Sequence, residues 1–468
     1  MFPRHEHQTL RTLEMDCKTR LAVCVLVFAL YLPCTSGLQV LYQPSLSSTF
    51  VVHQELPFTV QYADASAIEA ITCVDYVQVG EYKARVPFGC FLDTNTPMLK
   101  NVDGIAGFGI PKLGARGESL PMPLLWALTD ARNTESNAQQ LQRKFTFFSS
   151  LDRAELQLGG YDPASIVGGQ MKEFQSRSTG EFVLGISSVK VGRTRQEAQE
   201  LLHFSPSLPA DKQWVGGVLD TGTSCLVLPS TELAGTLTAA PFPLFVSTFL
   251  DKKRAPPEFS AEAARIRNEG GEIGKPGVWL VVEGEELFLP YESLLIAGTD
   301  KPCVRGSPPM SQSSILLGDV FFRSYAVLFD VSRASRAQPA TLGLAAINPN
   351  YQIIPKSSPI LPSGDLLRMA VARNAADAAE EAQAEAAGVD KLPIENRRGT
   401  QYFLELTVGT PPQLLKVALD TGSSTFGVFV GQTSMNEVLA VELGNPIPIR
   451  QELRPDPVPL RPIPVLPA

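Results

Sequence analysis

The chain has 468 residues, 44% of them hydrophobic, and a formal net charge of −8. This length accommodates two large β-rich lobes with extra segments, and the apolar content is sufficient for a full core. The net charge is negative and the sequence has no basic run, so nothing in the charge pattern indicates a nucleic-acid partner.

The first feature in chain order is an apolar run at residues 21–32, which follows Lys18 and Arg20 and precedes Pro33. The run is shorter than the ~20 residues that a membrane-spanning helix needs, so it is typical of a secretory signal peptide. The arm before it is long and contains acidic residues, so an uncleaved signal anchor that holds the chain to a membrane stays an alternative. Either reading of residues 1–37 directs the chain into the secretory pathway, where it is secreted or kept in an acidic vacuole or vesicle.

The middle of the chain is patterned as β-strands. Residues 38–192 alternate apolar and polar positions between Gly and Pro, with one helical stretch near 121–131. Residues 193–213 resemble a polar insertion, and strand patterning then continues from 214 to 347 around a charged stretch near 251–275. The composition therefore predicts a mostly β protein.

The character changes after residue 347. Residues 348–399 are expected to be a linker whose Ala/Glu-rich part favours an exposed helix. Residues 400–430 return to strong β patterning. Residues 433–468 are predicted to be a Pro-rich tail, extended and unpacked from 445 onward.

Four of the seven cysteines lie beyond residues 1–37. Cys73 and Cys90 flank a predicted hairpin and come close to facing each other, so they could form a disulfide in an oxidising compartment or stay as two buried thiols. Cys225 precedes the apolar residues Leu-Val-Leu, and this frame predicts a buried thiol and not a nucleophile.

The sequence Asp-Thr-Gly occurs twice, at 220–222 and 420–422, each time after an apolar run and before hydroxyl residues. The two copies supply Asp220 and Asp420 on two similar strand-to-turn units. Two carboxyl groups about 3 Å apart cannot both ionise and therefore share one proton. The ionised member can take a proton from water while the protonated member polarises a scissile carbonyl. This chemistry needs no cofactor and no metal, and the pair His5 and His7 precedes the apolar run, which makes a metal site there improbable.

Six neighbouring residues are expected to support the two aspartates. The glycines permit tight turns that bring backbone N–H groups to the carboxylates. The hydroxyl residues that follow them can donate to the outer carboxylate oxygens. The threonines directly after the aspartates can hydrogen-bond across a lobe interface. These residues are Thr221, Gly222, Thr223, Thr421, Gly422 and Ser423.

On these motifs the chain resembles the pepsin-like aspartic proteases, the family of pepsin, cathepsin D and plasmepsins. The resemblance covers residues 40–192, 214–347 and 400–430. Its other motifs are the strands at 402–413, the stretches 45–50 and 76–80 around the flap, the apolar-Gly segments 103–109 and 315–321 behind the aspartates, and the closing strand 342–345.

The resemblance implies a bilobed, pepsin-like acid protease fold and an aspartic endopeptidase that acts as a monomer on peptide or protein substrates. It also implies that Tyr62 lies on a flap over the substrate and that Ile105 lies near it. The first lobe would comprise 38–177 plus 400–432 and contain Asp420, and the second lobe would comprise 178–347 and contain Asp220.

The sequence departs from the family pattern in three ways. The opening segment of the family stands at 400–430, after the rest, so the order is permuted. Ala63 and Ala65 replace the usual glycines of the flap tip. The aromatic residue usual after the first Asp-Thr-Gly is absent, and Phe426 and Gly427 stand there.

Three accounts of the chain follow. It is a circularly permuted enzyme, since permutation is tolerated where chain ends are close. Alternatively it fuses two tandem protease copies, so that 360–468 opens the second copy. A third hypothesis, from another class, is a catalytically silent peptide-binding protein in which the Asp420 segment is misassembled.

Overall fold

The computed structural model describes residues 39–62, 66–95, 99, 102–113, 119–133, 135–192, 199–203, 213–228, 277–296, 299, 303–306, 314–353, 389–397 and 401–443. Several predictions fall outside the described residues: the apolar run at 21–32, Ala63 and Ala65, the charged stretch 251–275, the Ala/Glu-rich stretch and the tail beyond 443. Among the residues that are described, no helix is both long and apolar enough to cross a membrane.

The two β-sheets contain most of the regular secondary structure of the described chain, which confirms the mostly β prediction. The strands of the larger sheet are β1 (Val51–Gln61), β2 (Ala67–Val79), β3 (Tyr82–Thr94), β4 (Gly104–Gly107), β5 (Lys144–Ser149), β6 (Ala154–Leu158), β7 (Lys172–Gln175), β16 (Tyr325–Asp330), β17 (Thr341–Ala346), β18 (Asp390–Asn396), β19 (Tyr402–Val408), β20 (Gln413–Asp420) and β21 (Phe426–Phe429). Their spatial order is β1-β2-β3-β21-β4-β20-β19-β18-β6-β5-β16-β17-β7.

The smaller sheet contains β8 (Val183–Gly192), β9 (Gln199–His203), β10 (Val215–Leu219), β11 (Leu226–Leu228), β12 (Gly277–Val282), β13 (Glu285–Pro290), β14 (Val304–Gly306) and β15 (Ile315–Leu317). Their order is β13-β12-β8-β10-β15-β11-β14, and β9 pairs with β8. The α-helices of the described residues are α2 (Leu124–Leu128), α6 (Asp319–Phe322) and α9 (Gln432–Leu443), and 3₁₀ turns lie at η1 (Pro44–Leu46), η3 (Ala138–Gln140), η4 (Pro163–Ser165), η5 (Val167–Gly169) and η8 (Tyr291–Leu294).

The hairpin of β2 and β3 shows how local sequence determines the strands. Its residues alternate between buried and more exposed positions, except at 70–73 and 88–91, where both faces of the strands are buried. The chain reverses at Gly80, whose φ of +55° lies in the left-handed region that glycine tolerates. Within this hairpin Cys73 pairs with Phe88, and Cys90 pairs with Ile71. Because Cys73 is two positions from Ile71 on the same strand, both cysteines lie on one face of the hairpin.

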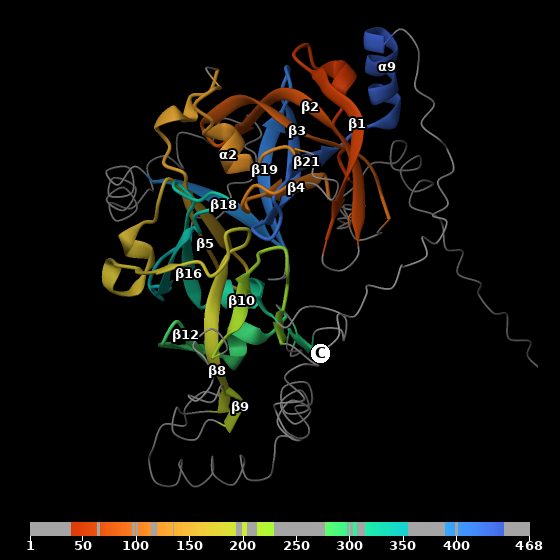
Figure 1. Cartoon of the computed structure of the whole chain (residues 1–468). Helices are drawn as coiled ribbons and strands as arrows, with labels where there is room; N and C mark the ends of the chain where they lie inside the picture. The colour runs from red at the N-terminus through yellow and green to blue at the C-terminus, as the bar shows by residue number, and fades with distance from the viewer. Residues whose placement is uncertain are drawn as a thin grey trace, which may run out of the picture. The chain divides into compact units, whose positions relative to one another are not determined.

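Strands from the C-terminal part of the chain lie inside the larger sheet. β20 runs parallel to β4, and β21 lies between β3 and β4. Figure 1 shows the blue β21 beside the orange β3 and β4. The sheet therefore needs residues 401–429 to be continuous.

Three segments differ from the sequence-based expectation. The end of the predicted linker, 389–397, contains β18, which pairs with β6 and β19. The predicted insertion contains β9. The start of the predicted tail is α9, where Met435 and Leu439 are one turn apart and buried. In each case, tertiary packing supplies a partner that composition alone does not reveal.

The distribution of strands also differs from the expected lobes. β16 and β17 come from the range expected for the second lobe, yet they pair with β5 and β7 in the larger sheet. Aromatic rings pack around them: Phe329 stacks on Phe145 at 4.6 Å and contacts Phe182 at 4.7 Å between centroids. One hydrophobic core includes residues of both sheets.

Candidate active site

Asp220 and Asp420 each lie at the end of a strand that has a parallel neighbour. Leu219 of β10 pairs with Leu317 of β15, and Asp420 of β20 pairs with Gly107 of β4. After each aspartate the chain turns and returns antiparallel to that neighbour, as β11 and as β21. Two sequence segments 200 residues apart therefore build the same loop.

The Asp220 carboxylate is held by the turn that follows it. The Gly222 N–H donates to Oδ1 at 2.9 Å, and the Thr223 hydroxyl donates to Oδ2 at 2.6 Å. Both bonds fix the orientation of the carboxylate. The backbone of Thr223 is fixed in turn, because its carbonyl accepts the Asp319 N–H at 2.8 Å.

The Asp420 carboxylate is held mainly by backbone groups. Its Oδ1 accepts the N–H groups of Gly422 at 2.9 Å and Ser423 at 3.1 Å. The Ser423 hydroxyl, expected to donate to this carboxylate, instead accepts the Thr425 N–H at 3.4 Å. The support expected of Ser423 thus comes from its N–H.

Each glycine makes room for the opposite aspartate. A Cβ atom at Gly222 would lie 2.6 Å from Asp420 Oδ1, and a Cβ atom at Gly422 would lie 2.7 Å from Asp220 Oδ1. Real Cβ atoms do not approach so closely, so both positions require glycine. The two turns are therefore in direct contact around the two carboxyl groups.

Thr221 and Thr421 join the two loops through four hydrogen bonds. Each hydroxyl accepts the backbone N–H of the other threonine at 3.0 Å. Each also donates at 3.0 Å to a carbonyl of the opposite strand, at Leu419 and Leu219. Both threonines are buried, so these bonds are shielded from water and fix the relative position of the aspartates.

The electrostatics of the pair favour a retained proton. Burial raises the pKa of the Asp420 carboxyl well above its ordinary value, and the charge of Asp220 and a hydrogen bond with it raise the pKa further. The N–H groups of Gly422 and Ser423 only partly offset this. The pair can therefore keep one proton where isolated carboxyls would be ionised.

A third carboxyl group, Asp319, lies behind the Asp220 loop. It is fully buried, and neither of its carboxylate oxygens has a hydrogen-bond partner among the described residues. Burial raises the pKa of Asp319 well above its ordinary value; the Arg323 charge opposes this, and the charges of Asp220 and Asp420 add to it. Asp319 belongs to the apolar-Gly segment 315–321, and no role was expected of it, although an acid in an otherwise apolar run was a signal.

Tyr62 lies directly after β1, at the tip of the hairpin that β1 forms with β2. Its N–H donates to the Ser66 carbonyl at 2.9 Å across the turn. The half-buried side chain packs on an apolar cluster that includes Ile105. Ile105 is only 3% exposed, so it belongs to the buried part of this cluster and offers almost no free surface.

Two disulfides are present in the described residues. Cys73 and Cys90 form the predicted one. The expectation of a buried thiol at Cys225 is wrong, because Cys225 is bonded to Cys303, 78 residues away. The even number of cysteines beyond residue 37 was a signal for a second pair.

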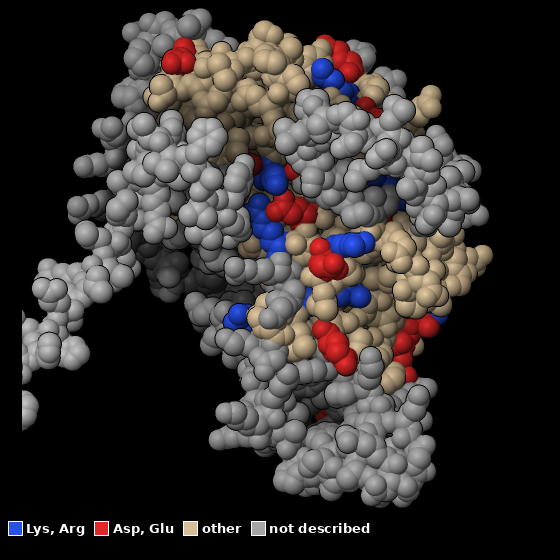
Figure 2. Space-filling model, turned by 180° about the vertical axis from the view of Figure 1, so that it is seen from behind, with Lys and Arg blue, Asp and Glu red and all other residues tan. Residues whose placement is uncertain are grey.

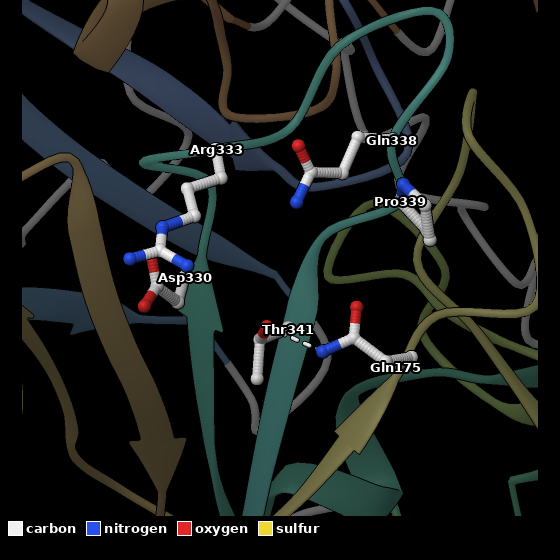
Figure 3. Close-up of a pocket in the computed structure, with 6 residues that line it drawn as sticks. All are labelled: Gln175, Asp330, Arg333, Gln338, Pro339 and Thr341. Atoms are coloured by element: carbon white, nitrogen blue, oxygen red, sulfur yellow. Dashed lines mark hydrogen bonds between the residues drawn. The ribbon is translucent and has the colours of Figure 1, made fainter.

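A separate cavity of about 90 Å³ lies beside the edge strand β7 and its neighbour β17 (Figure 3). It is lined by Gln175, Asp330, Arg333, Gln338, Pro339 and Thr341, none of which belongs to the aspartate loops. Acidic and basic side chains are interspersed over the described part of the face in Figure 2. Neither feature competes with the aspartate pair as a reactive centre.

The comparisons agree with this geometry. The family model described as eukaryotic aspartyl protease matches residues 29–341 and 401–442. Napsin-A of Homo sapiens is 26% identical over 319 residues, which is 65% of this chain and 66% of that protein. The probable aspartic-type endopeptidase opsB of Aspergillus fumigatus is 23% identical over 305 residues, 62% of this chain and 57% of that protein.

A shorter and closer match is to vacuolar protease A of Neurospora crassa, 53% identical over 45 residues, which cover 10% of this chain and 11% of that protein. The chain thus spans less than two thirds of the length of each of these relatives. The family model, by contrast, covers most of the chain and includes both aspartate loops. The chain belongs to the eukaryotic aspartyl protease family.

Proposed function

We propose that the chain is an aspartic endopeptidase that hydrolyses peptide bonds through a water molecule activated by Asp220 and Asp420. The observation that supports this best is the meeting of two carboxyl groups in two equivalent turns, with the pKa of Asp420 raised by burial and by Asp220. The ionised member of the pair takes a proton from water, and the protonated member polarises the scissile carbonyl. No covalent intermediate is needed.

Tyr62 is the proposed lid residue. Its hairpin belongs to the same sheet as Asp420, and Tyr62 packs on the cluster that includes Ile105. Closing the hairpin over a bound peptide would exclude water from the reacting bond. The substrate is proposed to be an extended peptide or protein segment with apolar side chains beside the cleaved bond, bound by a monomeric enzyme.

The chain order is proposed to be a circular permutation. Tyr42, near the start of the described chain, forms a parallel bridge with Val430, and its N–H donates to the Phe429 carbonyl at 2.9 Å. The Asp103 carboxylate accepts the N–H groups of Val40 at 2.7 Å and Lys416 at 2.8 Å. These contacts support one fold completed by its own C-terminal segment more than they support two tandem copies.

The compartment is proposed to be the secretory pathway, either outside the cell or in an acidic vesicle. Two disulfides are typical of an oxidising compartment. One relative is named a vacuolar protease. Anchoring through residues 21–32 remains part of this proposal.

The decisive experiment compares the parent chain with Asp220→Asn and Asp420→Asn on denatured serum albumin between pH 2 and 7. We expect a bell-shaped profile on the acid side, because one shared proton is required. Each substitution should lower turnover by about 10²–10⁴-fold or more, since general acid–base catalysis is lost. Thermal unfolding should show that both variants are folded.

Titration with a pepstatin-type inhibitor separates the alternatives. Tight binding to the parent chain would support an assembled pair. A folded chain that binds peptides, does not bind the inhibitor and does not hydrolyse the peptides would be the catalytically silent binding protein. Full activity in Asp420→Asn would contradict the pair within one chain.

A further inference from the structure

Gly427 on β21 lies against an aromatic ring from the neighbouring strand. A Cβ atom at position 427 would lie 2.3 Å and 2.4 Å from the ring atoms Cε1 and Cζ of Phe91. Gly427 pairs with Gly89 of β3, and Phe429 pairs with Phe91. The Phe91 ring therefore occupies the volume that a side chain at position 427 would take.

A second glycine makes room for the same ring. A Cβ atom at Gly89 would lie 2.9 Å from Phe91 Cε1. The Phe91 ring is fully buried and meets the Phe429 ring edge-on at 5.3 Å. An edge-on pair at this separation is a favourable aromatic arrangement. Two glycines and one aromatic partner thus define a single position for the ring.

The surroundings of Phe91 link the lid hairpin to the Asp420 loop. Phe91 belongs to an apolar cluster with Phe58, Val60, Ile68, Ala70, Ile105 and Phe429. Tyr62 packs against this cluster from the tip of the β1–β2 hairpin. Phe429 lies on the strand that follows the Asp420 turn. A close-packed cluster transmits the position of one member to the others.

We infer that Phe91 is a positioning residue for Tyr62: its ring fills the volume that a side chain at position 427 would take and supports the apolar cluster on which Tyr62 packs. This inference rests on the proposed peptidase function, because it assigns Tyr62 to the lid. Phe91 acts through Tyr62 and touches no reacting atom.

The test is a double-mutant cycle with Phe91→Leu and Tyr62→Ala. Leucine keeps an apolar side chain in the core, so the variant should fold. We expect Phe91→Leu to lower kcat/KM about tenfold in the parent chain and less than about twofold in the Tyr62→Ala background, because coupled residues are not additive. The assay measures cleavage of one peptide bond that is first identified in the albumin digest.

Phe88→Leu is the matched control. Phe88 lies on the same strand and is equally buried, but it contacts Tyr42 and Phe426 in the other core cluster. Its effect on kcat/KM should be the same with and without Tyr62. If Phe91→Leu also has the same effect in both backgrounds, the inference is overturned.

A readout independent of catalysis separates this inference from the proposed function. Acrylamide quenching of an indole introduced as Tyr62→Trp should increase when Phe91→Leu is added and stay unchanged with Phe88→Leu. Unchanged quenching with Phe91→Leu would overturn the inference even in an active enzyme. If no variant has peptidase activity, the proposed function fails, and the quenching alone decides whether Phe91 positions residue 62.

Discussion

The Asp220 and Asp420 loops have the same backbone arrangement, but different contacts stabilise them. Each aspartate ends a strand with a parallel neighbour, and each turn contributes one threonine to the four hydrogen bonds between the loops. The Asp220 loop continues at Cys225 into a disulfide, whereas the Asp420 loop continues into β21 beside the Phe91 ring. Equivalent geometry is therefore maintained by a covalent bond on one side and by aromatic packing on the other.

The two loops also differ in the residue behind them. Asp319 follows Gly318 behind the Asp220 loop, and Phe108 follows Gly107 behind the Asp420 loop. The hydrogen bonds between the two threonines are thus symmetric, whereas the residues behind the two loops differ in charge. Shape is set by the backbone ladder, and proton affinity is set by the side chains around it.

The largest expected effect comes from removing the segment that supplies the Asp420 loop. A chain ending at Ile353 lacks β18 to β21, so the edges of β3, β4 and β6 become unpaired. We expect aggregation and no activity, because open edges and apolar surface are exposed. Light scattering and circular dichroism measure this.

Two further chains sharpen that result. A chain ending at Leu443 keeps every described strand and should unfold at the same temperature as the full chain. A separate peptide of residues 389–443 should partly restore solubility to the shortened chain, as strand addition does. If the chain ending at Ile353 is soluble and as stable as the parent, the permutation proposal is wrong.

Removing each disulfide tests how much the covalent bonds contribute to stability. Replacing Cys225 and Cys303 by Ala opens a loop of 78 residues, and replacing Cys73 and Cys90 opens one of 17. Each double variant should lose about 2–4 kcal/mol of unfolding free energy, and the longer loop should lose about 1 kcal/mol more. Urea unfolding measures both, with the reduced parent chain as control. A larger loss for the shorter loop would show that strain or local packing dominates.

Substitutions of the two threonines test the symmetric hydrogen bonds between the loops. Thr221→Val and Thr421→Val each remove a hydroxyl that accepts one N–H and donates to one carbonyl, which leaves buried groups without partners. Each should cost about 1–3 kcal/mol, and the two costs should be similar. Thr→Ser at the same positions keeps the hydroxyl and should recover most of the loss. A markedly unequal pair of costs would indicate that one loop is held by other contacts.

A substitution of Asp319 tests the difference in charge behind the two loops. Because burial raises its pKa in the folded state, the unfolded state ionises first as pH rises above about 4, and the native carboxyl then reduces stability. Asp319→Asn should therefore match the parent at pH 3 and gain about 1 kcal/mol over it between pH 4 and 5. Thermal unfolding across this range measures the difference.

Glu395 provides a control of opposite sign. Burial acts to raise its pKa, but hydrogen bonds from Lys416 and Arg397 outweigh this and lower the pKa to about 2. Its contribution to stability is present above about pH 4.5 and is lost as pH falls toward 2, so Glu395→Gln should be less stable than the parent at pH 5 and equal to it at pH 2. A gain for Asp319→Asn that does not depend on pH would contradict the ionisation argument.

The sequence by itself determined the elements that depend on neighbouring residues. Alternating polarity predicted the strands, Gly80 permits the turn between β2 and β3, and both members of the Cys73–Cys90 bond lie on that one hairpin. The two Asp-Thr-Gly copies placed both aspartates after apolar runs, where the structure has β10 and β20. These features are local, and a short window of sequence contains the information that specifies them.

Only the tertiary structure decided which distant segments meet. It paired Cys225 with Cys303, folded the start of the predicted tail into α9, and placed the Phe91 ring beside Gly427. It also buried Asp319 behind the aspartate pair, which raises the pKa of its carboxyl. The physical reason is that burial, charge coupling and close packing depend on neighbours brought together by the whole fold, and no local pattern in the chain specifies them.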